Sequence, residues 1–196
     1  GKGDPLPARA VTFELLWVAP LSPCHGVVQS PTARKASVDY GDVVLWDGAP
    51  VSVQQQEGRP VPVFPLLWIL RPGSEKRLRF VGMQKRPNSV QELGEQLGAR
   101  ASLWVIDRRT APARDGEIPA GSELFYGKLI VPADTPLAEL RTALEREIHA
   151  RPGLTLAIPQ LYELLGDTPA AGKAHQAWGG IERAAEKLGL LSARAR

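Results

Sequence analysis

KRLRFVGM, at residues 76–83, opens the stretch of sequence that decides the fold. Its basic and apolar side chains alternate, as they do in a strand with one buried face. A helix is expected to begin at Ser89, because Ser89 and Glu92 have the spacing of a capping box and Gly98 supplies a stop. The short apolar run SLWVI, at residues 102–106, then predicts a second strand.

The same alternation of elements continues further along the chain. Residues 124–131 predict a strand, and Thr135 is expected to cap a helix whose first residue is Pro136. Residues 154–158 predict one more strand. The resulting order at about residues 76–158 is that of a ferredoxin-like βαββαβ unit. We therefore expect an α+β fold with an antiparallel or mixed sheet.

The sequence before this stretch predicts an N-terminal β-rich part. Residues 11–18 (VTFELLWV) are rich in β-branched and aromatic side chains, which is typical of a strand. Residues 19–41 hold many Pro, Ser and Gly, so a long loop or a broken strand is expected there. Asp47-Gly48, between two apolar runs, predicts a hairpin with a type I′ turn.

A proline-rich segment follows the predicted hairpin. PVPVFP, at residues 60–65, cannot lie inside a sheet because proline donates no ladder hydrogen bond. An edge strand or a polyproline segment is expected instead. Residues 66–71 (LLWILR) are then free to join a sheet.

The chain divides into three predicted parts. Residues 1–9 are expected to be a flexible lead, residues 10–167 an α+β domain, and residues 168–196 a C-terminal helical appendage. The appendage is Ala-rich and weakened at Gly179-Gly180. Tryptophan is over-used at protein interfaces, so Trp178 is predicted to contact a partner protein or domain.

Composition excludes several classes of protein. With 43% hydrophobic residues the chain is not a fully disordered one, and no apolar run approaches the ~20 residues of a membrane span. A single cysteine, Cys24, excludes an internal disulfide and a multi-cysteine zinc site. A soluble, cytoplasmic, bacterial protein is expected. Because the sequence starts with Gly1 and its one methionine is Met83, we expect a processed product or a piece of a longer protein.

Positive charge gathers in the middle of the sequence. Residues 71–114 hold ten basic and four acidic residues, a net charge of +6, whereas the whole chain carries +3. Such a basic patch binds phosphates or an acidic protein surface. The alternative is a solvated sheet face whose arginine stems cover apolar surface. The candidate binding residues are Arg77, Arg79, Lys85, Arg86, Arg108 and Arg109.

The sequence contains no constellation that points to a reaction or a cofactor. Gly-x-Ser-x-Gly, the P-loop and Gly-x-Gly-x-x-Gly are all missing. Cys24 and His25 are neighbours that would point to opposite faces of a strand. Glu145 and His149 share a helix face, but a surface ion pair is the simpler interpretation. No catalytic, cofactor-binding or metal-binding residue is therefore predicted.

Three functions remain in order of preference. The first is a non-catalytic protein-interaction or adaptor module, part of a larger protein or assembly. The alternative is a nucleic-acid-binding domain that uses the basic patch within residues 71–114. The third is a small enzyme with a site near Asp107, which ends an apolar strand as catalytic carboxylates often do.

Overall fold

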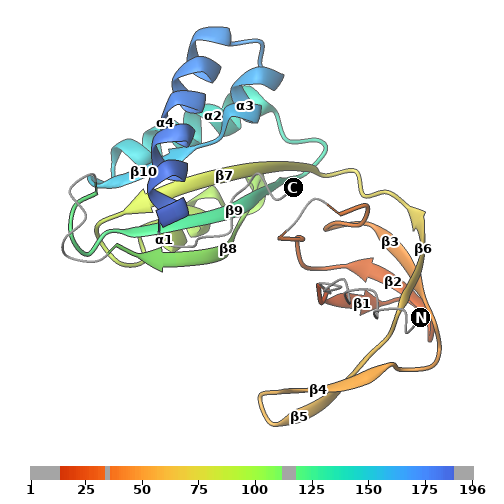
Figure 1. Cartoon of the computed structure of the whole chain (residues 1–196). Coiled ribbons are helices and arrows are strands. Elements are labelled where there is room, and N and C mark those ends of the chain that lie inside the picture. The colour runs from red at the N-terminus through yellow and green to blue at the C-terminus, as the bar shows by residue number, and fades with distance from the viewer. Residues whose placement is uncertain (1–13, 34–35, 112–117, 188–196) are drawn as a thin grey trace, which may run out of the picture.

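The chain has an α+β fold built on two separate four-stranded antiparallel sheets (Figure 1). The computed structural model describes residues 14–33, 36–111 and 118–187. A β-rich N-terminal part and helices toward the C-terminus confirm the predicted fold class. The expected flexible lead, residues 1–9, lies outside the described residues. The boundary between residues 167 and 168 stays a prediction.

The N-terminal sheet has the strand order β1-β2-β3-β6, which leaves β6 at an edge. Its strands are β1 (Val18–Pro20), β2 (His25–Val28), β3 (Val43–Trp46) and β6 (Leu66–Arg71). The strand predicted at residues 11–18 is wrong over residues 14–17, because β1 begins only at Val18; residues 11–13 lie outside the described residues. Trp17 O still accepts from Gln29 N at 2.7 Å, but Trp17 N donates to the side chain of Ser30 at 2.9 Å, so the regular ladder does not extend to this residue.

The hairpin predicted at Asp47-Gly48 is wrong, and a hairpin forms instead between the next two strands. β4 (Ser52–Gln56) pairs with β5 (Arg59–Val63), and the turn residues Glu57 and Gly58 both have positive φ, as a type I′ turn requires. Asp47 instead accepts a hydrogen bond from Ala49 N at 3.1 Å in a local side-chain turn. The predicted edge strand at the prolines is confirmed, because β5 pairs with β4 alone.

The C-terminal sheet has the strand order β10-β7-β9-β8, and all three of its pairings are antiparallel. The elements that form it or connect its strands are β7 (Lys76–Gln84), α1 (Ser89–Leu97), η1 (Gly98–Arg100), β8 (Ser102–Thr110), β9 (Glu123–Val131), α2 (Leu137–His149) and β10 (Leu154–Ala157). Two more helices follow, α3 (Pro159–Leu164) and α4 (Thr168–Lys187).

The predicted capping box at the start of α1 is wrong. Asn88 occupies the cap position in the left-handed conformation and makes no side-chain cap hydrogen bond. Ser89 Oγ donates to Arg86 O at 3.0 Å, and Glu92 forms an ion pair with Arg86 at 2.8 Å. Both side chains that a capping box needs, those of Ser89 and Glu92, therefore bind Arg86 in the turn before the helix.

The other two predicted helix features also differ. Thr135 Oγ1 donates to Arg100 O at 3.2 Å, and the cap position of α2 belongs to Pro136. α4 runs unbroken through Gly179-Gly180. Here packing against the sheet outweighs the low helix propensity of glycine.

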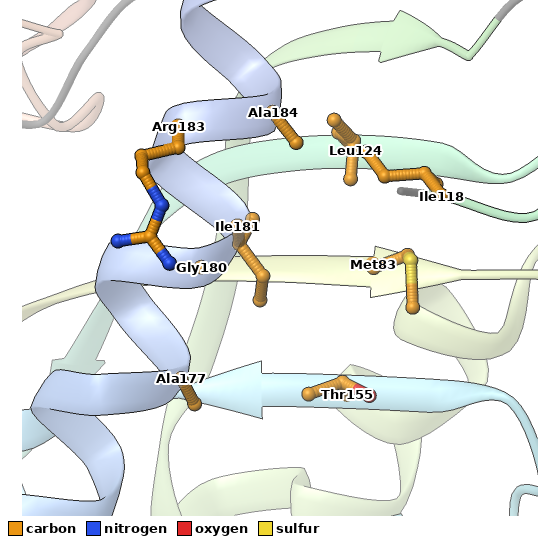
Figure 2. A pocket seen from close by; sticks show the side chains of 9 residues that line it. All are labelled: Met83, Ile118, Leu124, Thr155, Ala177, Gly180, Ile181, Arg183 and Ala184. Atoms are coloured by element: carbon orange, nitrogen blue, oxygen red, sulfur yellow. The ribbon is translucent and has the colours of Figure 1, made fainter. Parts of the chain in front are cut away.

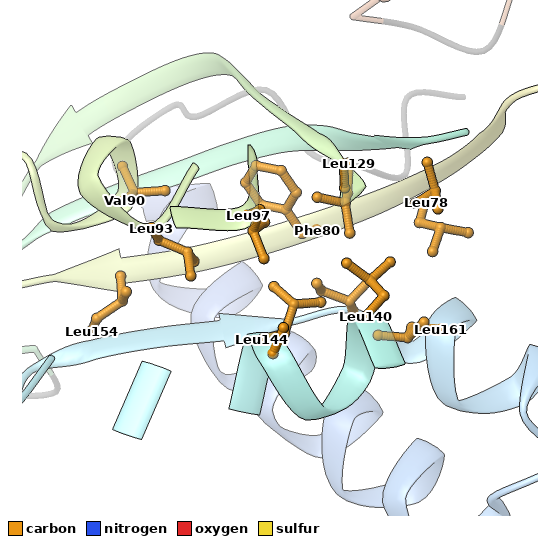
Figure 3. Close-up of a cluster of buried hydrophobic side chains, with 14 of the residues drawn as sticks. Leu78, Phe80, Val90, Leu93, Leu97, Leu129, Leu140, Leu144, Leu154 and Leu161 are labelled. Atoms are coloured by element: carbon orange, nitrogen blue, oxygen red, sulfur yellow. The ribbon is translucent and has the colours of Figure 1, made fainter. Parts of the chain in front are cut away.

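The C-terminal sheet is covered on both faces. One face packs against α1 and α2 through a large cluster that includes Phe80, Leu93, Phe125 and Leu140 (Figure 3). The opposite face carries Val81, Leu124 and Tyr126 and packs against alanines of α4. The helices on the two faces, together with the contacts of Tyr126 and Lys128 with residues 32, 33 and 39, account for the burial of β9 along nearly its whole length.

Candidate partner-binding surfaces

The six predicted basic residues do not form one patch. Arg77 and Arg79 on β7 lie opposite Ile130 and Lys128 of β9. Arg109 on β8 lies opposite Leu124, so it is about 20 Å along β9 from the level of Arg77 at ~3.4 Å per residue. Arg108 lies opposite Phe125, which faces α1 and α2, so the two neighbouring arginines point to opposite faces of the sheet.

Acidic side chains accompany most of these cations. Arg77 pairs with Asp42, and three further pairs join Arg86 to Glu92 at 2.8 Å, Arg108 to Glu123 at 3.5 Å and Arg109 to Asp107 at 2.6 Å. Exposed pairs of this kind contribute little to stability, but they lower the local positive potential. Lys85, which follows β7, is exposed. Binding by the six residues stays a prediction.

Asp107 is held by its own neighbours. Its Oδ1 accepts from Arg109 at 2.6 Å and from the Arg108 backbone at 2.8 Å. Within residues 14–33, 36–111 and 118–187, no group of three or more His, Cys, Asp or Glu side chains is placed to hold a metal ion.

Trp178 packs against the chain's own core. The side chain is half-buried on α4 beside the cluster that contains Val81 and Ala184. An open pocket of about 370 Å³ lies between α4 and the sheet, with Met83, Ile181 and Arg183 in its lining (Figure 2). A second pocket, of about 500 Å³, lies between α1 and β8.

A polar contact that sequence reasoning missed joins the two parts of the molecule. Lys128, in the middle of β9, is only 6% exposed. Its Nζ donates to Thr32 Oγ1 at 2.8 Å and pairs with the carboxylate of Asp39. Beside it the Tyr126 hydroxyl donates to Ala33 O at 3.3 Å, and burial raises the pKa of that hydroxyl. One signal was present: a lysine inside the apolar run LFYGKLIV requires a buried partner.

The second feature that sequence reasoning missed is an exposed apolar surface on β6. Leu67, Trp68 and Leu70 are 53%, 69% and 51% exposed, and Leu66 is exposed as well. We call these four residues the β6 patch. Periodicity did not reveal it, because LLWILR has the composition of a buried strand. Nothing in the sequence showed that these side chains are left uncovered by the other described residues.

The described helices include none with the length and apolarity needed to cross a membrane. No protein-family model, curated protein sequence or solved structure matches this chain.

Proposed function

We propose that the protein is a non-catalytic protein-interaction module and that the β6 patch is its main contact surface. The observation that carries this proposal is the exposure of large apolar side chains at neighbouring positions of one edge strand. Contiguous apolar patches on soluble proteins commonly mark interaction sites. Trp68 is the most exposed member, and tryptophan is enriched among residues that dominate binding energy.

The energy of such a contact supports a protein partner. Covering a large apolar side chain contributes about 1.5–3 kcal/mol. Register shifts interrupt the pairing of β3 with β6 on both sides of Val44 and Leu45. Irregular edges resist the addition of another strand. We therefore infer that the partner packs on the side chains of β6 and does not extend the sheet.

We also propose that the C-terminal sheet with α1 and α2 is a ferredoxin-like unit. Numbered within the unit, its strand order is 4-1-3-2, and both helices pack into one core cluster. Such a unit supplies a stable base from which the smaller sheet presents the β6 patch.

Trp68→Ser tests the proposed function. A partner is identified by cross-linking to the native full-length product in its own cells, and its affinity is then measured with purified components. Trp68→Ser is expected to weaken binding at least tenfold. Leu164→Ser, an exposed leucine on α3, is the matched control and is expected to leave affinity unchanged. Equal affinities for the wild type and Trp68→Ser contradict the proposal.

Nucleic-acid binding is the alternative, supported by the net charge of +6 in residues 71–114. It predicts binding to unspecific DNA or RNA that weakens steeply with salt. Replacing Lys85, Arg86 and Arg108 with alanine should then reduce the salt dependence. Arg86 and Arg108 form ion pairs with Glu92 and Glu123 at the surface, so their replacement should cost little stability.

A further inference from the structure

A row of side chains crosses three strands on one face of the C-terminal sheet. Arg79 of β7 and Trp104 of β8 both lie directly opposite Lys128 of β9. Opposed residues of a sheet point to the same face, and like charges placed directly opposite destabilise it. Lys128 is buried beside Arg79, so its ammonium group needs a negative group in front of it.

The chain itself supplies that negative group. Residues 38–42 (VDYGD), here called the acidic strap, bring Asp39 to Lys128 and Asp42 to Arg77. The Tyr40 ring lies 6.1 Å from the Trp104 ring, centroid to centroid. Each of these three strap residues thus meets a charged or aromatic side chain of the sheet.

The acidic strap belongs to an unusually long connection. β2 and β3 are antiparallel neighbours, and the chain between them runs from residue 29 to residue 42. Hairpin loops usually have two to five residues, and loops much longer than that are commonly functional. Part of this connection packs in the core of the N-terminal sheet through Val38, and Asp39 and Tyr40 contact β9 and β8.

The strap satisfies only some of the hydrogen-bond donors on this face of the sheet. Arg77 Nε is buried and has no hydrogen-bond partner among the described residues, although its guanidinium reaches Asp42. The contact with β7, β8 and β9 is polar: no strap residue belongs to either apolar cluster of the C-terminal sheet, and the one apolar strap residue, Val38, packs in the cluster of the N-terminal sheet. Ion pairs and hydrogen bonds without a shared apolar core can be replaced by an equivalent ligand, because its groups repeat the same contacts.

We propose that this face, formed by Arg77, Arg79, Lys128 and Trp104, is a docking site for an acidic segment of another protein, which the acidic strap occupies in cis. The occupant that the structure shows is a peptide, and it uses features of a peptide. The ring of Tyr40 in the strap stands beside Trp104, and the backbone carbonyl of Ala33, which precedes the strap in the same connection, accepts from Tyr126. An acidic protein segment repeats this chemistry more closely than a nucleic acid does. The site is distinct from the β6 patch.

The experiment is a competition between the strap and a copy of it added in trans. The probe is a fluorescein-labelled peptide with the sequence of residues 36–43 (ASVDYGDV), titrated by fluorescence anisotropy against the full chain. Asp39→Asn weakens the chain's own strap, so this variant is expected to bind the peptide at least tenfold more tightly than the wild type. A peptide with asparagine at both aspartate positions is the matched control and should not bind. Binding to Asp39→Asn should weaken as salt is raised.

A second substitution locates the site. Adding Lys128→Met to Asp39→Asn is expected to abolish binding, whereas adding Trp68→Ser is expected to leave it unchanged, which separates this proposal from the β6 patch. Equal binding by the wild type and Asp39→Asn, or binding that survives Lys128→Met, overturns the proposal. Tighter binding of a single-stranded oligonucleotide than of the peptide overturns the assignment to a protein partner.

Thr32→Val provides the same test if Asp39→Asn does not unfold cooperatively. It removes one hydrogen-bond acceptor of Lys128 and keeps the shape of the side chain. Peptide affinity above that of the wild type supports the proposal, and an unchanged affinity contradicts it.

Discussion

The two four-stranded sheets of this protein differ in how much of each is buried. The C-terminal sheet has α1 and α2 on one face and α4 on the other, and its strands β7, β8 and β9 each have nine residues. The strands of the N-terminal sheet have three to six residues. Among the described residues, the buried members of its apolar cluster are three valines. A sheet with a helix layer on each face can carry the stability of the molecule, which leaves the smaller sheet free to expose apolar contact residues.

The first way to test this comparison is to remove core volume from each sheet. Leu93→Ala, on α1, should lower the free energy of unfolding by about 3 kcal/mol, because it empties a fully buried site. Val44→Ala, in the N-terminal sheet, should cost about 1 kcal/mol, because a smaller side chain leaves a smaller cavity. Urea unfolding followed by circular dichroism measures both. Equal losses would contradict the expectation that the substitution in the N-terminal sheet leaves the smaller cavity.

The second test addresses the contact between the two parts. Asp39→Asn leaves the buried Lys128 facing Arg79 without a counter-charge and should cost about 3 kcal/mol. Lys128→Met should cost less, about 1 kcal/mol, since Asp39 keeps the backbone donors of Thr32 and Tyr40. Thermal unfolding of both single variants and of the double variant gives the coupling. A larger loss of unfolding free energy for Lys128→Met than for Asp39→Asn would contradict the expected penalty of leaving Lys128 without a counter-charge.

The sequence predicted the C-terminal sheet better than the N-terminal one, for a physical reason. In β7, β9 and α2 the burial of one or two faces leaves a periodic record, and the predicted strands and helices of this region appear at their expected places. The predicted hairpin at Asp47-Gly48 failed because turn residues report only local preference. The partner of β3 is β6, which lies beyond a second hairpin, and pairing across that distance has no local signal.

The candidate surfaces were predicted less well than the fold. Clustered charges in the sequence indicated a basic patch, but strand register separates Arg77 from Arg109. The role of Lys128 was not predicted, because a single lysine in an apolar run does not show which residue pairs with it. Its partner, Asp39, lies 89 residues earlier in the sequence. An exposed strand such as β6 looks like a core strand until the packing of its neighbours is known.

The third test concerns the β6 patch. Trp68→Ser should change the free energy of unfolding by less than about 0.5 kcal/mol, because an exposed side chain loses little packing. Trp46→Ser should cost more, since Trp46 packs on the N-terminal core and its ring lies 6.4 Å from that of Phe64. Urea unfolding compares the two tryptophans directly. A large loss for Trp68→Ser would show that the β6 patch is structural.

The smallest expected effect concerns the helix that covers the outer face of the C-terminal sheet. Asp167 precedes α4; its carboxylate accepts from Ala170 N at 3.0 Å and from Arg141 at 2.7 Å, and these two hydrogen bonds lower the pKa of Asp167 below its ordinary value of 3.8. A carboxyl whose pKa is lowered in the folded state stabilises that state above the ordinary pKa, and this contribution is lost as the pH falls through the folded value. Asp167→Asn should therefore lower the Tm at pH 7, and the difference from the wild type should shrink as the pH approaches 3. A Tm difference for Asp167→Asn that stays constant with pH would show that the charge of Asp167 does not hold the start of α4 in place.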